Sequence, residues 1–137
     1  MKIQRPNERR PEAGDPAHFT GRAWLSGMLA PEAPDHMNVV EVTFEPGARS
    51  DWHTHPGGQV LLPLSGRGRI RSEGGRLERM QVGDALWIPA GERHWHGADP
   101  DSFLVQLSVT IGADGTAWDD ERVTDEEYLG TAQPAGD

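Results

Sequence analysis

Hydrophobic and polar residues alternate along several short stretches of this chain, which is the pattern of strands with one buried face. In one stretch Val40, Val42 and Phe44 alternate with polar residues until a Pro-Gly pair follows. Similar stretches, each followed closely by turn residues, cover residues 60–64, 68–72, 84–88 and 103–111. Because no helical pattern separates them, they predict a β-sandwich or barrel in a single all-β domain.

The two ends of the chain differ from this central part. Residues 1–17 are polar and contain three prolines, so we expect an extended N-terminal arm. The barrel is expected over residues 18–112 and an acidic C-terminal segment over residues 113–137. In that segment Thr124-Asp125-Glu126-Glu127 forms a capping box, which predicts a short helix through Tyr128 and Leu129.

Composition narrows the possible functions. The 137 residues fit one domain. Their formal net charge of −9 opposes nucleic-acid binding, which needs a basic surface. The absence of cysteine excludes disulfides and thiol ligands. No apolar run approaches the roughly 18 residues of a membrane span, and no signal-peptide core is present, so we expect a cytoplasmic protein.

Four of the six histidines form two pairs, His53/His55 and His94/His96. Residues i and i+2 of a strand share a face, so each pair presents two imidazoles side by side. Gln59 follows a Pro-Gly-Gly turn that lets it fold back beside the first pair. Neutral nitrogen and oxygen donors of this kind suit a divalent Mn, Fe, Co, Ni or Zn ion. The alternative is that these are surface histidines, or core histidines bonded to the backbone.

The spacing around the histidines resembles the two motifs of the cupin family. The first is Gly47-(five residues)-His53-Thr54-His55-(three)-Gln59-(six)-Gly66, and the second is Gly83-(five)-Pro89-Ala90-Gly91-(two)-His94. This resemblance implies a jelly-roll-like antiparallel β-barrel with a metal in one mouth. It makes His53, His55 and His94 ligands and puts Gln59 where most cupins have glutamate. Such a shell is neutral, so it leaves the ion's charge uncompensated and favours Lewis-acid chemistry.

A narrower resemblance covers residues 18–130. The segments His53-Thr54-His55-Pro56-(x)-Gly58-Gln59 and Gly91-Glu92-(x)-His94-Trp95-His96-Gly97-Ala98 are similar to the small bacterial cupins that include manganese-dependent hydroxynitrile lyases. That group implies manganese as the first candidate metal and a C–C lyase acting on a small organic substrate. Small cupins also usually cover an exposed sheet edge with a second copy, so we expect a homodimer.

Further residues have predicted roles beside the ion. His96 shares the face of His94 one pleat further on and is either a general base or a group that orients another ligand or binds water. Val40, Val42 and Phe44 are expected to form an apolar substrate pocket. Gln106 is expected in the same pocket, where lyases of this type would carry another histidine.

Two other functions stay open at this point. One is a cupin dioxygenase or other oxidoreductase acting on a small organic molecule. The other is a non-enzymatic cupin that binds a metal or a small ligand. The histidine pattern fits all three functions, because it specifies the metal donors and leaves the substrate undefined.

Overall fold

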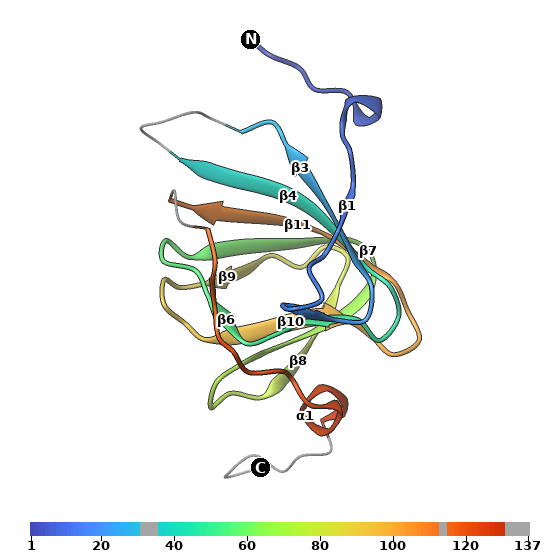
Figure 1. Cartoon of the computed structure of the whole chain (residues 1–137), viewed down its shortest axis with the longest axis vertical. Coiled ribbons are helices and arrows are strands. Elements are labelled where there is room, and N and C mark those ends of the chain that lie inside the picture. The colour runs from blue at the N-terminus through green and yellow to red at the C-terminus, as the bar shows by residue number, and fades with distance from the viewer. Residues whose placement is uncertain (31–35, 113–114, 131–137) are drawn as a thin grey trace.

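A computed structural model describes residues 1–30, 36–112 and 115–130 of the chain, and nearly all of its regular structure is strand (Figure 1). The strands are β1 (Glu12–Ala13), β2 (Phe19–Thr20), β3 (Ala23–Met28), β4 (Met37–Phe44), β5 (Arg49–Ser50), β6 (His53–Thr54), β7 (Gln59–Ser72), β8 (Leu77–Gln81), β9 (Leu86–Ile88), β10 (His94–Ala98), β11 (Leu104–Ile111) and β12 (Ala117–Trp118). A 3-10 turn, η1 (Pro6–Glu8), and the helix α1 (Asp125–Leu129) complete the described elements.

The strands form one antiparallel sheet that curls on itself. Its order is β1-β3-β4-β11-β7-β10-β5-β2, with β8 and β9 paired to β7 and with β12 paired to β6 beside β10. In Figure 1 the upper layer of β3, β4 and β11 faces the lower layer around β10 across the interior. This arrangement confirms the prediction of an all-β antiparallel barrel.

Strand β7 differs from the sequence prediction, which divides it into two strands at Ser65-Gly66. The strand runs unbroken from Gln59 to Ser72. Gly66 has a φ of 77°, and the register with β11 shifts between Val105 and Gln106. The glycine therefore bends the strand from one side of the barrel to the other, and the ladder continues across the bend.

Both flanking regions contribute strands to the sheet. Strand β1 lies within the predicted arm and pairs with β3. Strand β12 lies within the predicted C-terminal segment and pairs with β6. Helix α1 begins after Thr124, whose side chain accepts a hydrogen bond from the Glu127 amide, which confirms the predicted capping box. The predictions for residues 113–114 and 131–137 lie outside the described residues. Among the described helices, none is long and apolar enough to cross a membrane.

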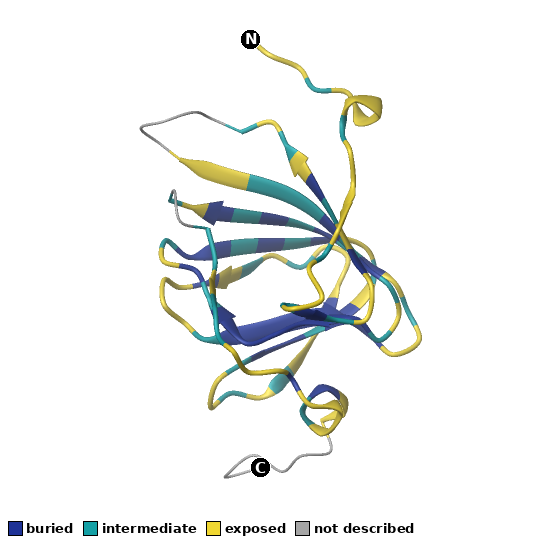
Figure 2. Ribbon diagram, viewed as in Figure 1, coloured by how far each residue is buried: buried dark blue, intermediate teal, exposed yellow. Residues whose placement is uncertain are grey.

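Two apolar clusters lie on opposite faces of the lower layer. The larger one fills the barrel and includes Phe44, Leu61 and Leu104, all fully buried. The smaller one lies outside the barrel beneath α1 and consists of Trp52, Trp95, Val123 and Tyr128. Figure 2 shows the resulting alternation of buried and half-buried residues along β11 and the first part of β7. Trp95 alternates with His94 and His96, so it points away from the histidines.

Candidate metal centre

Four buried histidines lie inside the barrel. His53 on β6 is the antiparallel partner of His94 on β10, and their ring centroids are 4.3 Å apart. Ring nitrogens of His53, His94 and His96 all lie within 4.8 Å of one another. His55, just after β6, has its ring centroid 4.9 Å from that of His53 and 5.4 Å from that of His94.

The three histidines grouped by the distances between their ring nitrogens differ from the predicted ligand set. The set with ring nitrogens within 4.8 Å of one another contains His96, which the sequence places one pleat further along, and does not contain His55. Distances between rings do not by themselves select ligands, because each imidazole offers a lone pair from only one nitrogen when it is neutral. The hydrogen bonds of the other nitrogen therefore decide which rings present a lone pair to the centre.

Three histidines hold their Nδ1 atoms against backbone carbonyl oxygens. The distances are 2.8 Å from His53 to Asp51, 2.7 Å from His55 to Gly115 and 2.9 Å from His94 to Glu92. A carbonyl oxygen only accepts hydrogen bonds, so Nδ1 carries the proton in each ring and Nε2 keeps the lone pair. Hydrogen bonds of this kind, from the nitrogen that does not bind the metal, orient metal-binding histidines.

At two places in the centre, lone pairs of ring nitrogen or amide oxygen atoms face no hydrogen-bond donor. The Nε2 atom of His55 is buried and has no hydrogen-bond partner. The Gln59 Oε1 atom lies 3.1 Å from the His94 Nε2 atom, and with the His94 proton on Nδ1 both atoms present lone pairs to each other. A cation bound between them removes this repulsion, so the donor set fits a metal ion.

Gln59 is held in this orientation by β11. Its Nε2 atom donates to the Ser108 hydroxyl at 2.8 Å. Because the amide nitrogen is engaged there, the amide oxygen faces His94.

His96 has the opposite arrangement. The Nε2 atom of Gln106 lies 2.8 Å from His96 Nδ1. An amide nitrogen donates, so His96 Nδ1 accepts and its proton lies on Nε2. The sequence predicts Gln106 as a pocket residue, whereas the structure places it fully buried behind His96 and outside the set of residues that line the cavity.

All four imidazoles are neutral at neutral pH. Burial lowers the pKa of His94 from 6.5 to about 4 and lowers the pKa of His53 and of His96 well below 6.5. Burial also lowers the pKa of His55. Charge repulsion from neighbouring histidines adds to the shifts of His53, His94 and His96. Protons therefore do not compete with a metal for these nitrogens near pH 7.

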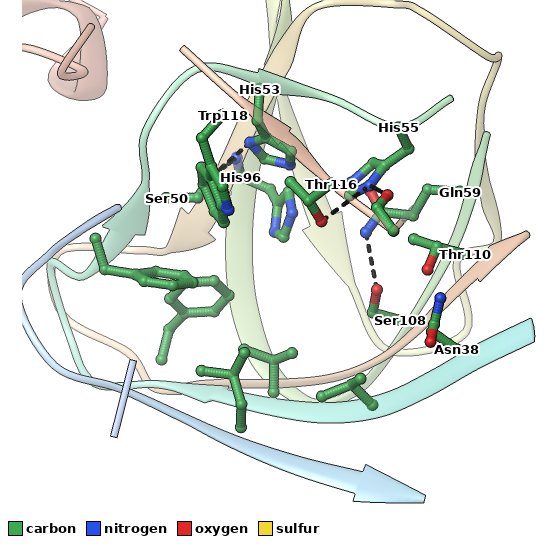
Figure 3. A pocket seen from close by; sticks show the side chains of 16 residues that line it. Asn38, Ser50, His53, His55, Gln59, His96, Ser108, Thr110, Thr116 and Trp118 are labelled. Carbon is green, nitrogen blue, oxygen red and sulfur yellow. Dashed lines mark hydrogen bonds between the residues drawn. The ribbon is translucent and has the colours of Figure 1, made fainter. Parts of the chain in front are cut away.

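A cavity of about 300 Å³ opens beside the histidines (Figure 3). Its apolar wall is formed by Phe19, Leu25, Val40, Val42, Phe44 and Trp118. His53, His55 and His96 face it together with the polar side chains of Asn38, Ser50, Gln59, Ser108, Thr110 and Thr116. The predicted pocket residues Val40, Val42 and Phe44 all line this cavity.

The C-terminal segment forms part of the cavity wall, which the sequence reasoning missed. Gly115, Thr116 and Trp118 line the cavity, and Gly115 supplies the carbonyl that holds His55. No local pattern marks these residues, because their role depends on the pairing of β12 with β6. Ser108 carries a usable signal, since it lies on the polar, inward-facing positions of β11.

Known proteins resemble this chain over most of its length. It is 40% identical over 129 residues to an (R)-mandelonitrile lyase of Granulicella tundricola, which covers 93% of this chain and 98% of the relative. A cupin-like protein of Thermotoga maritima has a TM-score of 0.82 and 35% identity, covering 93% of this chain and 96% of its own. A polyketide cyclase of Streptomyces resistomycificus shares the fold alone, with a TM-score of 0.73, 20% identity, and coverage of 98% and 94%.

The family comparison agrees with these relatives. The cupin domain matches residues 40–110, which is more than half of the chain and contains all four buried histidines. Both cupin motifs lie on the strands and turns that bring those histidines together. This chain belongs to the cupin domain family.

Proposed function

We propose that this protein is a metal-dependent hydroxynitrile lyase, which cleaves a small cyanohydrin to an aldehyde and hydrogen cyanide and catalyses the reverse addition. The observation that carries the proposal is the 40% identity to the (R)-mandelonitrile lyase over nearly the full length of both chains. The neutral donor set and the cavity with one apolar wall also support the lyase proposal. The reaction needs stabilisation of a developing negative charge beside the apolar group of the substrate.

His53, His55 and His94 would hold the ion through Nε2, and Gln59 would add its amide oxygen. A bound divalent ion supplies Lewis acidity, which lowers the pKa of a hydroxyl group beside it. Manganese is the first candidate because of the resemblance to the manganese-dependent lyases. Iron, cobalt, nickel and zinc accept the same donors.

The apolar wall would bind the aryl or alkyl group of the substrate. Phe19, Phe44 and Trp118 offer aromatic surface, and their ring centroids lie 5.5–6.0 Å apart where they touch. In cleavage, the bond between the hydroxyl-bearing carbon and the nitrile carbon breaks, and its electron pair leaves with cyanide. The hydroxyl proton ends on cyanide as hydrogen cyanide. His96 lines the cavity beside the proposed ligands, so we propose it as the catalytic residue.

The test combines metal analysis with a cleavage assay of the full chain. After reconstitution with manganese, wild type is expected to hold about one ion per chain and to cleave mandelonitrile. His94→Ala should lose both properties, whereas His36→Ala, which alters an exposed histidine outside the centre, should keep both. Bound metal without cleavage would overturn the lyase proposal, and oxygen consumption by the iron-loaded protein would then favour an oxidoreductase.

We also propose that two copies associate through the outer face of β4, β11, β7 and β9. There Val109 is the cross-strand partner of both Val39 and Val60, and Val60 is the partner of the exposed Trp87. These side chains form a continuous apolar row that a second copy would cover. Wild type is expected to elute as a dimer by light scattering, and Val60→Glu as a monomer. A monomeric wild type would refute this proposal.

A further inference from the structure

We infer that Gln106 fixes the proton of His96 on Nε2, so that His96 faces the cavity as a hydrogen-bond donor for a small anion rather than as a general base. The inference rests on the proposed function for the identity of that anion, which is cyanide. It assigns Gln106 as a positioning residue, since Gln106 is fully buried and acts through His96.

The contact between the two side chains carries the inference. Gln106 Nε2 lies 2.8 Å from His96 Nδ1. An amide nitrogen has hydrogens and no lone pair to offer, so the neutral imidazole accepts at Nδ1 and keeps its hydrogen on Nε2. The three proposed ligands show the reverse pattern, because each of them donates from Nδ1 to a carbonyl oxygen.

The amide of Gln106 has a reason to keep this orientation. Its Oε1 atom is buried without a partner, so one acceptor is unsatisfied. Turning the amide by half a turn would place Oε1 on His96 and leave both Nε2 hydrogens in the space that Oε1 now occupies. Buried unpaired N–H groups are rarer in proteins than under-satisfied carbonyl oxygens. The observed orientation therefore leaves the smaller defect.

The ring of His96 is also fixed in place. Its backbone amide donates to the Ser50 hydroxyl at 3.2 Å, and the ring packs edge-on against Phe44 with centroids 5.7 Å apart. One of its ring nitrogens lies within 4.8 Å of ring nitrogens of His53 and His94. A donor held rigidly beside the proposed metal position is suited to bind the negative charge that develops on departing cyanide.

The first experiment reads the tautomer in the wild-type protein and uses a variant only to assign the His96 signals. The full chain, with ¹⁵N-labelled imidazoles and loaded with diamagnetic zinc, is examined by long-range ¹H–¹⁵N NMR, and His96 is assigned by the loss of its signals in His96→Ala. His96 is expected as the Nε2–H tautomer, while His53, His55 and His94 in the same spectrum show Nδ1–H. A His96 ring with its proton on Nδ1 would overturn the inference.

A pair of variants then tests the role of Gln106. Gln106→Glu keeps the length and replaces the donor with an acceptor, so His96 should change to the Nδ1–H tautomer. Gln106→Asn is too short to keep the contact, and it should leave a mixture of tautomers. An unchanged His96 tautomer in Gln106→Glu would refute the positioning role.

The kinetic consequence separates this inference from the proposed function. Loss of one donor from an anion site costs about 10²–10³-fold in kcat, so manganese-loaded Gln106→Glu should lose mandelonitrile cleavage by that factor with KM within about twofold. Full activity with the tautomer reversed would overturn the donor role. If wild type shows the Nε2–H tautomer and no cleavage, the proposed function fails and the assignment of Gln106 stands.

Discussion

The two ends of the barrel are built from the same strands, but their interiors differ. One end is packed with apolar side chains, and the other contains polar side chains and a cavity. On β11 the fully buried Leu104 packs with Phe44 at one end, while Gln106, Ser108 and Thr110 face inward toward the other. The first end is filled with apolar side chains. The second end holds four imidazoles, the side-chain amides of Asn38, Gln59 and Gln106, and a cavity. One strand therefore serves both packing and chemistry, divided along its length.

This division separates the residues that stabilise the fold from those that bind ligands. Apolar burial at the packed end supplies folding free energy. At the open end, inward polar groups are buried at a cost that hydrogen bonds offset only in part, as the unpartnered atoms of His55 and Gln106 indicate. Substitutions at the two ends should consequently differ in kind, which allows the comparison to be tested.

The largest expected effect is on stability, from Leu104→Ala at the packed end. Leu104 is fully buried in the main core, so its truncation should lower the free energy of unfolding by about 2–5 kcal/mol. Urea unfolding measures this loss. Leu129→Ala, which truncates a half-exposed leucine on α1, is the matched control and should cost under about 0.5 kcal/mol. A tenfold loss of metal affinity in folded Leu104→Ala would show that the two ends are coupled.

The open end should make the metal-free protein sensitive to acid. The pKa of His94 is about 4 in the folded chain against 6.5 ordinarily, so between these values the unfolded chain binds a proton that the folded chain does not. Stability is therefore complete above pH 6.5 and falls as the pH drops toward 4, by roughly 3 kcal/mol for this residue. His53 and His96, with pKa values also lowered, add to the loss.

Urea unfolding of the metal-free chain at several pH values between 7 and 4 measures this effect. His94→Gln removes the titrating group, so its stability should depend less steeply on pH than that of wild type. Equal slopes for the two proteins would contradict the assignment of the acid sensitivity to His94.

The sequence predicts the parts of this site that depend on local spacing. His53 and His55, the turn before Gln59, and the His94/His96 pair are each fixed by a few neighbouring residues, and the structure brings them together in the barrel. The inward position of Val40 and Val42 follows from strand alternation in the same way. The capping box before α1 is equally local, since Thr124 and Glu127 are three residues apart.

Contacts that depend on how the strands pair explain what the sequence did not reveal. Gly115 holds His55 from 60 residues away in sequence, and Gln106 reaches His96 only because β11 and β10 both flank β7. Neither contact produces a periodic pattern in the sequence.

The cytoplasmic location remains a prediction.

A moderate effect is expected where β11 supports a proposed ligand. Ser108→Ala removes the hydroxyl that holds the Gln59 amide, so the Gln59 oxygen loses its fixed direction. Loss of such a supporting contact weakens metal binding by about 10–100-fold. Competition with a chelator measures the affinity. Ser26→Ala, at a buried serine on β3 outside the cavity, should bind metal as wild type does, and equal affinities for both variants would refute the role of Ser108.

The smallest effect should come from the helix that covers the outside of the barrel. Thr124→Ala removes the cap of α1, in which the Thr124 hydroxyl accepts from the Glu127 amide at 3.1 Å, and should cost about 1 kcal/mol of unfolding free energy. Thr124→Ser keeps the oxygen and should lose less. Because α1 packs on the Trp95 face of β10 rather than on the histidine face, metal affinity should stay within twofold of wild type. A larger change would show that the covering of β10 from outside controls the position of His94 and His96 within.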